Sequence, residues 1–407
     1  MRYIINRRDF TLGAAAGVLT AAGFAPHARA AMPPLKIGVL LPRSGIQALI
    51  GQGCQRGFDV AVKMMAARGI PVELLNADTE SKPEVARTQA ERLVHDGAHV
   101  ICGAFDSGQT AAAAQVCEQH GVPMVINIGA DPAITEQGYK FVFRNFPTSI
   151  MLGTGSLAWM GALFKATHTA PKTAVLMIIN DTFGQGYQKG LNALLPKAGL
   201  PFKIVETISY DPQAKDLSVE VAKAKAAKAD LHLAVTRLND GILMIREMVK
   251  QRYSPMGVIS PGAPGFYERQ FIKVLGKYAE YNFSINAWMD PKQDLTKELE
   301  TTFYKEFPDQ SFDLNIGFSF EAVMIAADAY KRAGSSKPQA LVEALKATNI
   351  GKRVMIGGPI HFDAKGQNPD TSMAVLQIRN AKPTVVLPQS NAELAPIFPV
   401  PPWSQRS

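Results

Sequence analysis

The chain has 407 residues, of which 47% are hydrophobic and 19% are charged, with a formal net charge of +8. This composition is typical of a globular protein and excludes a disordered one. The sequence contains no run of five lysines or arginines and no basic residues interleaved with aromatic ones, so we expect no nucleic-acid partner.

The first thirty residues are typical of a twin-arginine export leader. Arg7 and Arg8 precede a mildly apolar run to Ala25, and a small-x-small signal peptidase pattern follows at residues 28–30. We expect a mature chain that begins near Ala31 and works in the periplasm; the alternative is an amphipathic N-terminus that stays on the protein. Because the leader carries four arginines and one aspartate, the mature chain has a net charge of +5.

Short apolar runs alternate with helical patterns after the leader, and the alternation restarts after Pro171. This order predicts right-handed βαβ units and parallel sheets. We expect strands at residues 36–41, 72–76, 100–103, 124–128, 172–179, 202–210, 231–235 and 257–260. We expect helices at residues 57–68, 84–95, 109–120, 186–195, 217–228, 242–251 and 321–333.

A short internal sequence repeat is consistent with two similar lobes. The segment GQGCQRG at residues 51–57 is matched by GQGYQKG at residues 184–190, each at the entrance to a predicted helix. Near the C-terminus we expect a hairpin from Gly357 to Ile378. The tail at residues 395–403 contains four prolines, so we expect it to lie extended over one lobe.

The cysteines and histidines offer no metal or redox chemistry. Cys102 and Cys117 are expected to be small buried hydrophobic residues, with a bridge between them as the alternative. His232 lies within a predicted strand and is expected in the core. No Cys or His pairs occur at zinc spacing, and we expect no cofactor.

Ligands of open parallel sheets bind beyond the carboxyl ends of the strands, and three loops there have suitable residues. They cover residues 103–110, 128–132 and 180–184. Ser107 either caps the helix that follows it or offers its hydroxyl and nearby backbone N–H groups to a carboxylate, which a helix N-terminus favours.

Six motifs follow one another along the chain: KIGVLLPRSG, ADTESKPEVARTQAERLV, GAFDSGQT, VPMVINIGADPAIT, YKFVFRNFPT and NDTFGQGYQKG. In this order they resemble the leucine/isoleucine/valine-binding family of periplasmic ABC-transporter receptors, and the similarity covers essentially the whole mature chain. The resemblance implies the type I periplasmic-binding fold: two Rossmann-like α/β lobes with parallel sheets, joined by three crossing segments. Such a protein closes on a small solute and presents it to a membrane permease.

The resemblance also implies the lobe boundaries. We expect crossings near Thr148, Asn286 and Phe362. The expected divisions are the signal peptide at residues 1–30, a first lobe of residues 31–148 plus 287–362, and a second lobe of residues 149–286 plus 363–407.

Family binding residues carry over at some positions only. In the first lobe, Ser107 matches the family's serine, Ala130 matches its alanine, and Asp131 replaces its threonine. In the second lobe, Phe183 takes the aromatic position before Gly-Gln-Gly. The tyrosine and glutamate of leucine-type receptors fall on Arg237 and Gly262.

These departures predict the ligand class. The change to Gly262 removes the carboxylate that pairs with an ammonium, and the change to Arg237 adds a bidentate donor for a carboxylate. Arg43 is a second candidate donor; the alternative for both arginines is a surface position. We therefore favour an amine-free aromatic or aliphatic acid over an amino acid. Asp131 is the exception, because it either holds an ammonium or pairs with an arginine.

The apolar wall of the site is expected from Phe105 and Phe183, with Trp288 as a further candidate. We expect a monomer that binds its solute without catalysis. The sequence contains no G-x-S-x-G, H-E-x-x-H or C-x-x-C-H motif. The alternatives are an enzyme exported by the twin-arginine route and a ligand-sensing ectodomain of the same fold.

Overall fold

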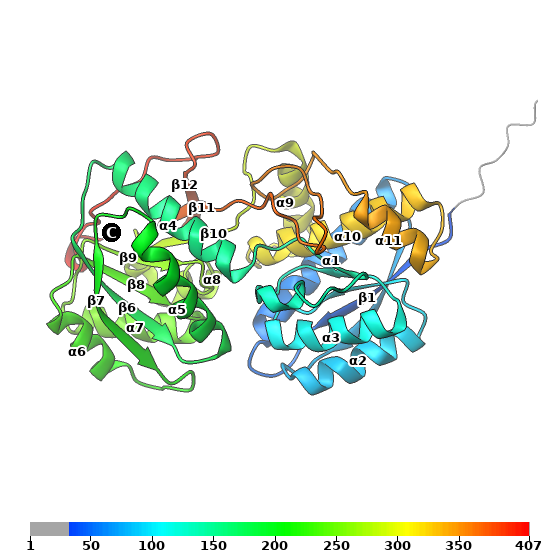
Figure 1. The fold of residues 1–407 in the computed structure, drawn as a ribbon. Helices are drawn as coiled ribbons and strands as arrows, with labels where there is room; N and C mark the ends of the chain where they lie inside the picture. Colours follow the sequence, from blue (N-terminus) through cyan, green and yellow to red (C-terminus); the bar gives the residue numbers. More distant parts are fainter. Residues whose placement is uncertain (1–31, 407) are drawn as a thin grey trace, which may run out of the picture. The chain divides into compact units, whose positions relative to one another are not determined.

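The computed structural model of the protein describes residues 32–406, so the predicted export leader lies outside the described residues. From Pro34 onward the chain forms one compact unit, which contains two separate sheets (Figure 1). Buried apolar strands alternate with amphipathic helices throughout, as the sequence predicts.

The first sheet has five parallel strands in the order β2-β1-β3-β4-β5. Helices α2 and α3 pack together against it, and α1 and α10 pack together on its other face (Figure 1). The strands are β1 (Leu35–Leu41), β2 (Val72–Asp78), β3 (Val100–Gly103), β4 (Met124–Ile126) and β5 (Val142–Arg144). The helices are α1 (Ala48–Ala67), α2 (Pro83–His95), α3 (Ser107–His120), α9 (Asp294–Glu306), α10 (Leu314–Ala333) and α11 (Pro338–Lys346).

The second sheet has seven strands in the order β12-β11-β10-β9-β8-β6-β7, and β11 and β12 run antiparallel at one edge. Helices α4 and α5 contact each other and the sheet, and α6, α7 and α8 form a second contacting group. The strands are β6 (Thr173–Ile179), β7 (Lys203–Tyr210), β8 (Leu231–Val235), β9 (Gly257–Pro261), β10 (Phe283–Asn286), β11 (Ala374–Arg379) and β12 (Lys382–Leu387). The helices are α4 (Ser149–Ala166), α5 (Thr182–Leu194), α6 (Ser218–Ala226), α7 (Leu238–Lys250) and α8 (Arg269–Leu275).

Two predicted elements are corrected by the structure. The helix expected at residues 57–68 begins nine residues earlier, at Ala48, so the GQGCQRG segment lies inside α1. The hairpin expected at residues 357–378 is wrong: only an isolated bridge joins Gly357 to Thr371, and the hairpin is β11–β12. Glycines, prolines and Asn/Asp residues between 357 and 370 interrupt the alternation that a strand requires.

The proline-rich tail is extended, as predicted, because residues 395–402 contain no helix or strand. It lies on the second sheet. The Gln377 side chain both donates to and accepts from the backbone of Ile397, and the N–H of Val400 donates to the carbonyl of Met256 (2.8 Å).

The buried cysteine and histidine side chains take structural roles, as predicted. Cys54, Cys102 and Cys117 are free thiols without exposed surface. Burial raises the pKa of the Cys54 thiol to about 12 and the pKa values of the other two further. His232 is also fully buried, and desolvation lowers its pKa to about 3.

Close packing of α1 on α10 requires a glycine at position 57. A Cβ there would lie 2.7 Å from the Ile316 carbonyl oxygen and 2.8 Å from the Ser319 Cβ. We expect Gly57→Ala to lower the free energy of unfolding by about 1–3 kcal/mol through overpacking. The matched control is Gly190→Ala in α5, where nothing lies within 4 Å of the added carbon. Denaturant titration of both variants measures this difference, and equal midpoints would contradict it.

Candidate functional site

Two loops of the first sheet meet at the carboxyl ends of β3 and β4. Helix α3 begins at Ser107, but its cap is Asp106, whose carboxylate accepts from the N–H groups of Gly108 (2.9 Å) and Gln109 (3.4 Å). The alternative in which Ser107 caps this helix is therefore wrong, because the preceding carboxylate already satisfies those donors. The Ser107 hydroxyl instead accepts from the N–H of Asp131 at 3.2 Å, so the structure brings two predicted site residues together.

A buried arginine holds the loop that follows β4. Arg144 has no exposed surface, and its Nη1 donates to the carbonyl oxygens of Gly129 (2.9 Å) and Asp131 (2.6 Å). Its Nη2 donates to Thr135 Oγ1 (2.8 Å) and its Nε to Gln367 Oε1 (2.6 Å). Burial lowers the pKa of this guanidinium to about 10. One side chain thus ties the loop to a segment more than 220 residues further along the chain.

The same loop also contacts the start of the next helix. The carboxylate of Asp131 accepts from the N–H of Ala133 (3.0 Å) and caps the short 3-10 turn at Pro132–Ile134. The carbonyl of Ala130 accepts from the N–H of Ser149 (2.7 Å), the first residue of α4. Asp131 makes no ion pair within the described residues, so its carboxylate is not the partner of an arginine there.

Three further predicted site residues, Arg43, Phe105 and Trp288, make no side-chain hydrogen bond to Ser107 or Asp131 in the described part of the chain. Arg43 is half-buried, and its backbone N–H, not its guanidinium, binds the Asp78 carboxylate (2.9 Å). Phe105 is half-buried and has a φ of 74°, in the left-handed region that non-glycine residues seldom adopt. Trp288 is buried against the ring of Tyr267, with the two ring centroids 5.3 Å apart, so it contributes to the core.

The predicted residues of the second sheet form a charged pair beside an aromatic ring. Arg237 donates through Nη2 (2.8 Å) and Nε (3.1 Å) to Asp181 Oδ2, and its guanidinium lies 5.5 Å from the Phe183 ring centroid. Asp240 accepts from the backbone N–H of Arg237 and from the hydroxyl of Tyr210. The guanidinium expected to bind a ligand carboxylate therefore already has an internal carboxylate, and only its Nη1 lacks a protein acceptor in the described part of the chain.

Gly262 follows β9, at the carboxyl edge of the same sheet. Its φ is +74°, and a Cβ would lie 3.3 Å from Leu152 Cβ, 3.4 Å from the Tyr187 ring and 3.5 Å from Ser156 Oγ. The backbone conformation thus disfavours any side chain here. No hydrogen bond or ion pair between residues 32 and 406 joins the Ser107 and Asp131 pair to the Arg237 and Phe183 pair.

Sequence reasoning missed a carboxylate beside this edge. Glu268 is the N-cap of α8; the residue is partly exposed, but its Oε1 is buried and has no hydrogen-bond partner among the described residues. Burial, and then the nearby Asp313, raise the pKa of Glu268 to about 8. Asp313 is the N-cap of α10 and is itself buried, which raises its pKa to about 6. The sequence feature that could have pointed to Glu268 is the presence of an acidic residue in the loop between a strand and a helix.

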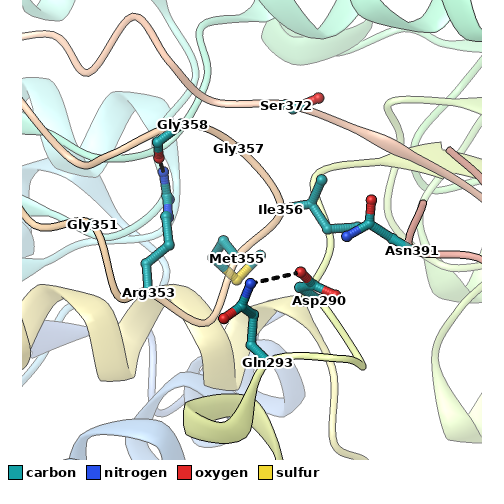
Figure 2. Close-up of a pocket in the computed structure, with 10 residues that line it drawn as sticks. All are labelled: Asp290, Gln293, Gly351, Arg353, Met355, Ile356, Gly357, Gly358, Ser372 and Asn391. Carbon is teal, nitrogen blue, oxygen red and sulfur yellow. Dashed lines mark hydrogen bonds between the residues drawn. The ribbon is translucent and has the colours of Figure 1, made fainter.

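Two cavities lie apart from all the predicted site residues. One, of about 360 Å³, is shown in Figure 2, where Gln293 donates to Asp290 (3.2 Å) and Arg353 donates to the Gly358 carbonyl (3.2 Å). The other, of about 920 Å³, lies beside β5 and includes Phe143 and Phe362. Neither cavity is lined by a predicted site residue, so the loops above are kept as the candidate site.

The described residues show neither a metal site nor a membrane-spanning helix. Between residues 32 and 406, no three His, Cys, Asp or Glu side chains gather where they could hold a metal ion. In the same range, no helix is both long and apolar enough to cross a bilayer.

Two α/β units with parallel-dominated sheets, carrying polar loops at the carboxyl ends of their strands, define the type I periplasmic-binding fold. The periplasmic binding protein family matches residues 34–383, and the chain belongs to this family. The family consists of solute-binding receptors of the periplasm or cell exterior.

Curated relatives are similar over most of their length. Leu/Ile/Val-binding protein homolog 7 of Brucella abortus (strain 2308) is 27% identical over 398 residues, covering 92% of this chain and 96% of that protein. Homolog 1 of the same strain is 26% identical over 338 residues, covering 81% of this chain and 86% of that protein.

Solved structures share the fold. A putative branched-chain amino acid ABC transporter from Silicibacter pomeroyi has a TM-score of 0.77 at 17% identity, covering 91% of this chain and 100% of its own. A solute binding protein from R. palustris in complex with benzoate has a TM-score of 0.74 at 18% identity, covering 89% and 98%. LivJ from Streptococcus pneumoniae in complex with isoleucine has a TM-score of 0.73 at 18% identity, covering 86% and 98%.

Proposed function

We propose that the protein is the solute-binding receptor of an ABC importer of the branched-chain amino acid type, and that it binds a small carboxylate-bearing solute. The observation that carries the proposal is the contact of Ser107 Oγ with the Asp131 N–H at the N-terminus of α3. It brings two loops together at the carboxyl edge of a parallel sheet, where the positive end of a helix suits a carboxylate.

The proposed mechanism is closure of two lobes on the solute, followed by docking on a membrane permease. A solute stabilises the closed state only through its higher affinity for that state. The proposal includes the lobe boundaries given above, export by the twin-arginine route to the periplasm, a monomeric receptor and the absence of catalysis. The proposed contact residues are Ser107, Ala130, Asp131, Arg43 and Phe105 of the first lobe and Phe183, Arg237 and Gly262 of the second.

The test is a thermal-shift screen of the mature protein against free amino acids and against the corresponding acids without an amine. A bound solute raises the melting temperature by mass action, so the shifts rank the ligands by affinity. We expect a shift with at least one carboxylate of these two sets. Isoleucine and benzoate, the ligands named for two structural neighbours, belong in the panel as one member of each class.

We expect Ser107→Ala and Arg237→Ala to weaken solute binding without unfolding the protein. Loss of one neutral hydrogen bond at Ser107 predicts a drop of about threefold to tenfold, and loss of a charged donor at Arg237 predicts about tenfold or more. Titration calorimetry measures both. Arg92→Ala is the control, because it removes an exposed guanidinium of α2 that pairs with Asp96, the residue that follows this helix. Wild-type affinity in both site variants would contradict the site assignment.

A further inference from the structure

The cavity shown in Figure 2 lies beside the two chain segments that lead between the sheets near the C-terminal half of the chain. Residues 287–293 connect β10 to α9, and residues 347–373 connect α11 to β11. An antiparallel bridge between Met289 and Met355 ties the two segments together. The cavity therefore has a wall held by backbone pairing, and none of the residues proposed to contact the solute lines it.

Asp290 places a nearly buried carboxylate in this cavity without a counter-charge. The residue is 7% exposed, and its carboxylate accepts only from two neutral donors, the backbone N–H of Lys292 (3.0 Å) and Gln293 Nε2 (3.2 Å). A carboxylate has about four acceptor sites, so about two remain free. Within residues 32–406, no lysine, arginine or histidine forms an ion pair with it. Because a carboxylate removed from water is costly without a positive partner, this site favours a cation.

Two cationic side chains near this carboxylate donate elsewhere. Arg353 lines the same cavity, but it donates through Nε (3.2 Å) and Nη2 (2.8 Å) to Glu321 and through Nη1 to the Gly358 carbonyl (3.2 Å). Figure 2 shows the Arg353 side chain extended toward Gly358. Lys292 donates through Nζ to the Ser390 carbonyl at 2.6 Å. The charge of Arg353 is balanced by the buried Glu321, so the cavity keeps one uncompensated negative charge.

The cavity is large enough for a small organic molecule. Its volume is about 360 Å³, whereas the share of one water molecule in the liquid is about 30 Å³ and ligand sites usually have about 300–1,000 Å³. Three polar atoms of its lining have no hydrogen-bond partner in the described part of the chain: Gln293 Oε1, Ser372 Oγ and Asn391 Nδ2. Met355 and Ile356 add a buried apolar surface. A bare metal ion would leave most of this space and these groups unused.

We propose that this cavity is a second binding site, separate from the solute site, and that it takes a small organic compound with a primary ammonium group. The three N–H donors of the ammonium suit the free acceptor sites of Asp290 and the unpaired Gln293 Oε1. Asn391 Nδ2 is then a donor for a hydroxyl or carbonyl oxygen of the same compound. The inference goes beyond the proposed function, because it holds whichever solute the protein carries.

The experiment titrates amines and their neutral isosteres into the mature protein by calorimetry. The probe pairs are 2-aminoethanol with 1,2-ethanediol and 1,4-diaminobutane with 1,4-butanediol, in about 150 mM sodium chloride to screen nonspecific attraction. We expect at least one amine to bind saturably and at least tenfold more tightly than its diol, because the diol cannot form a charge-assisted bond. In Asp290→Asn the affinity for this amine should fall about tenfold or more, with the affinity for the diol unaffected.

The matched control is Asp294→Asn. This carboxylate lies four residues further along the chain, is fully exposed and does not line the cavity, so the variant should bind the amine as the wild type does. If Asp290→Asn does not fold, as judged by circular dichroism, Asn391→Leu takes its place. It removes the loop amide and adds apolar bulk at the cavity lining, and we expect the same loss of amine affinity.

The outcomes separate this inference from the proposed function. Equal affinity for an amine and its diol, or unchanged amine affinity in a folded Asp290→Asn protein, would overturn the second site. Absence of amine binding by the wild type would overturn it as well, and so would binding of sodium, potassium, magnesium or calcium ions alone at Asp290. The receptor function is tested by the carboxylate panel and is unaffected by any of these results.

Discussion

Replacing Glu321 by alanine should lower the free energy of unfolding by about 3–5 kcal/mol, because it leaves a buried guanidinium without its counter-charge. Glu321 has no exposed surface and pairs with Arg353 at 2.8 Å. Its carboxylate also accepts from Asn145 Nδ2 (2.6 Å) and from the backbone N–H groups of Val354 (2.9 Å) and Met355 (3.0 Å). Denaturant unfolding followed by circular dichroism measures the loss.

The double variant Glu321→Leu/Arg353→Met is the matched control. Replacing both members of a buried ion pair by apolar residues of similar size is often nearly neutral, so it should recover much of the lost stability. If the Glu321→Ala protein were as stable as the wild type, the ion pair would not hold α10 to the segment around Val354.

Replacing Arg144 by methionine should impair both stability and solute binding. The substitution leaves four acceptors without their donor, among them the buried carbonyl oxygen of Gly129 and the partly buried carbonyl oxygen of Asp131. We expect a loss of about 3 kcal/mol or more in unfolding free energy, since each bond to a charged donor contributes about 1.5–3 kcal/mol. We also expect weaker solute binding, because the loop that carries Asp131 loses its support. Calorimetric titration at a temperature where the variant is folded measures the second effect.

The conservative variant Arg144→Lys tests whether Arg144 positions the loop for solute binding in addition to stabilising the fold. An ammonium reaches fewer of the four acceptors than a planar guanidinium, so the lysine should restore folding more than binding. Gln367→Leu removes only one of the four bonds and should have the smaller effect on affinity. Full affinity in a folded Arg144→Met protein would contradict the role of Arg144 in positioning the loop.

The alternation of apolar runs and helical patterns was enough to predict the α/β fold, because a strand such as Val100–Gly103 or Leu231–Val235 is buried along its whole length. The start of α1 was missed because Ala48 follows a polar loop without a side-chain cap. The hairpin was misplaced because the glycines, prolines and Asn/Asp residues between 357 and 370 interrupt the strand pattern there, and only an isolated bridge joins Gly357 to Thr371.

The candidate site was predictable only in part. The loops after the strands were found because their positions depend on the order of strands and helices. The pairing of Arg237 with Asp181, and of Arg144 with Gln367, depends on which loops become neighbours in space. The same holds for Glu268, whose unpaired oxygen follows from burial and from the approach of α10.

The measurement that tests the receptor function most directly is calorimetric titration of the mature protein after co-purified solute has been removed by partial denaturation and dialysis. The titrants are the amino acids and the matched amine-free acids named above. We expect saturable binding of at least one of them with one site per chain. Absence of binding by every member of both sets, in a protein that circular dichroism shows to be folded, would contradict it.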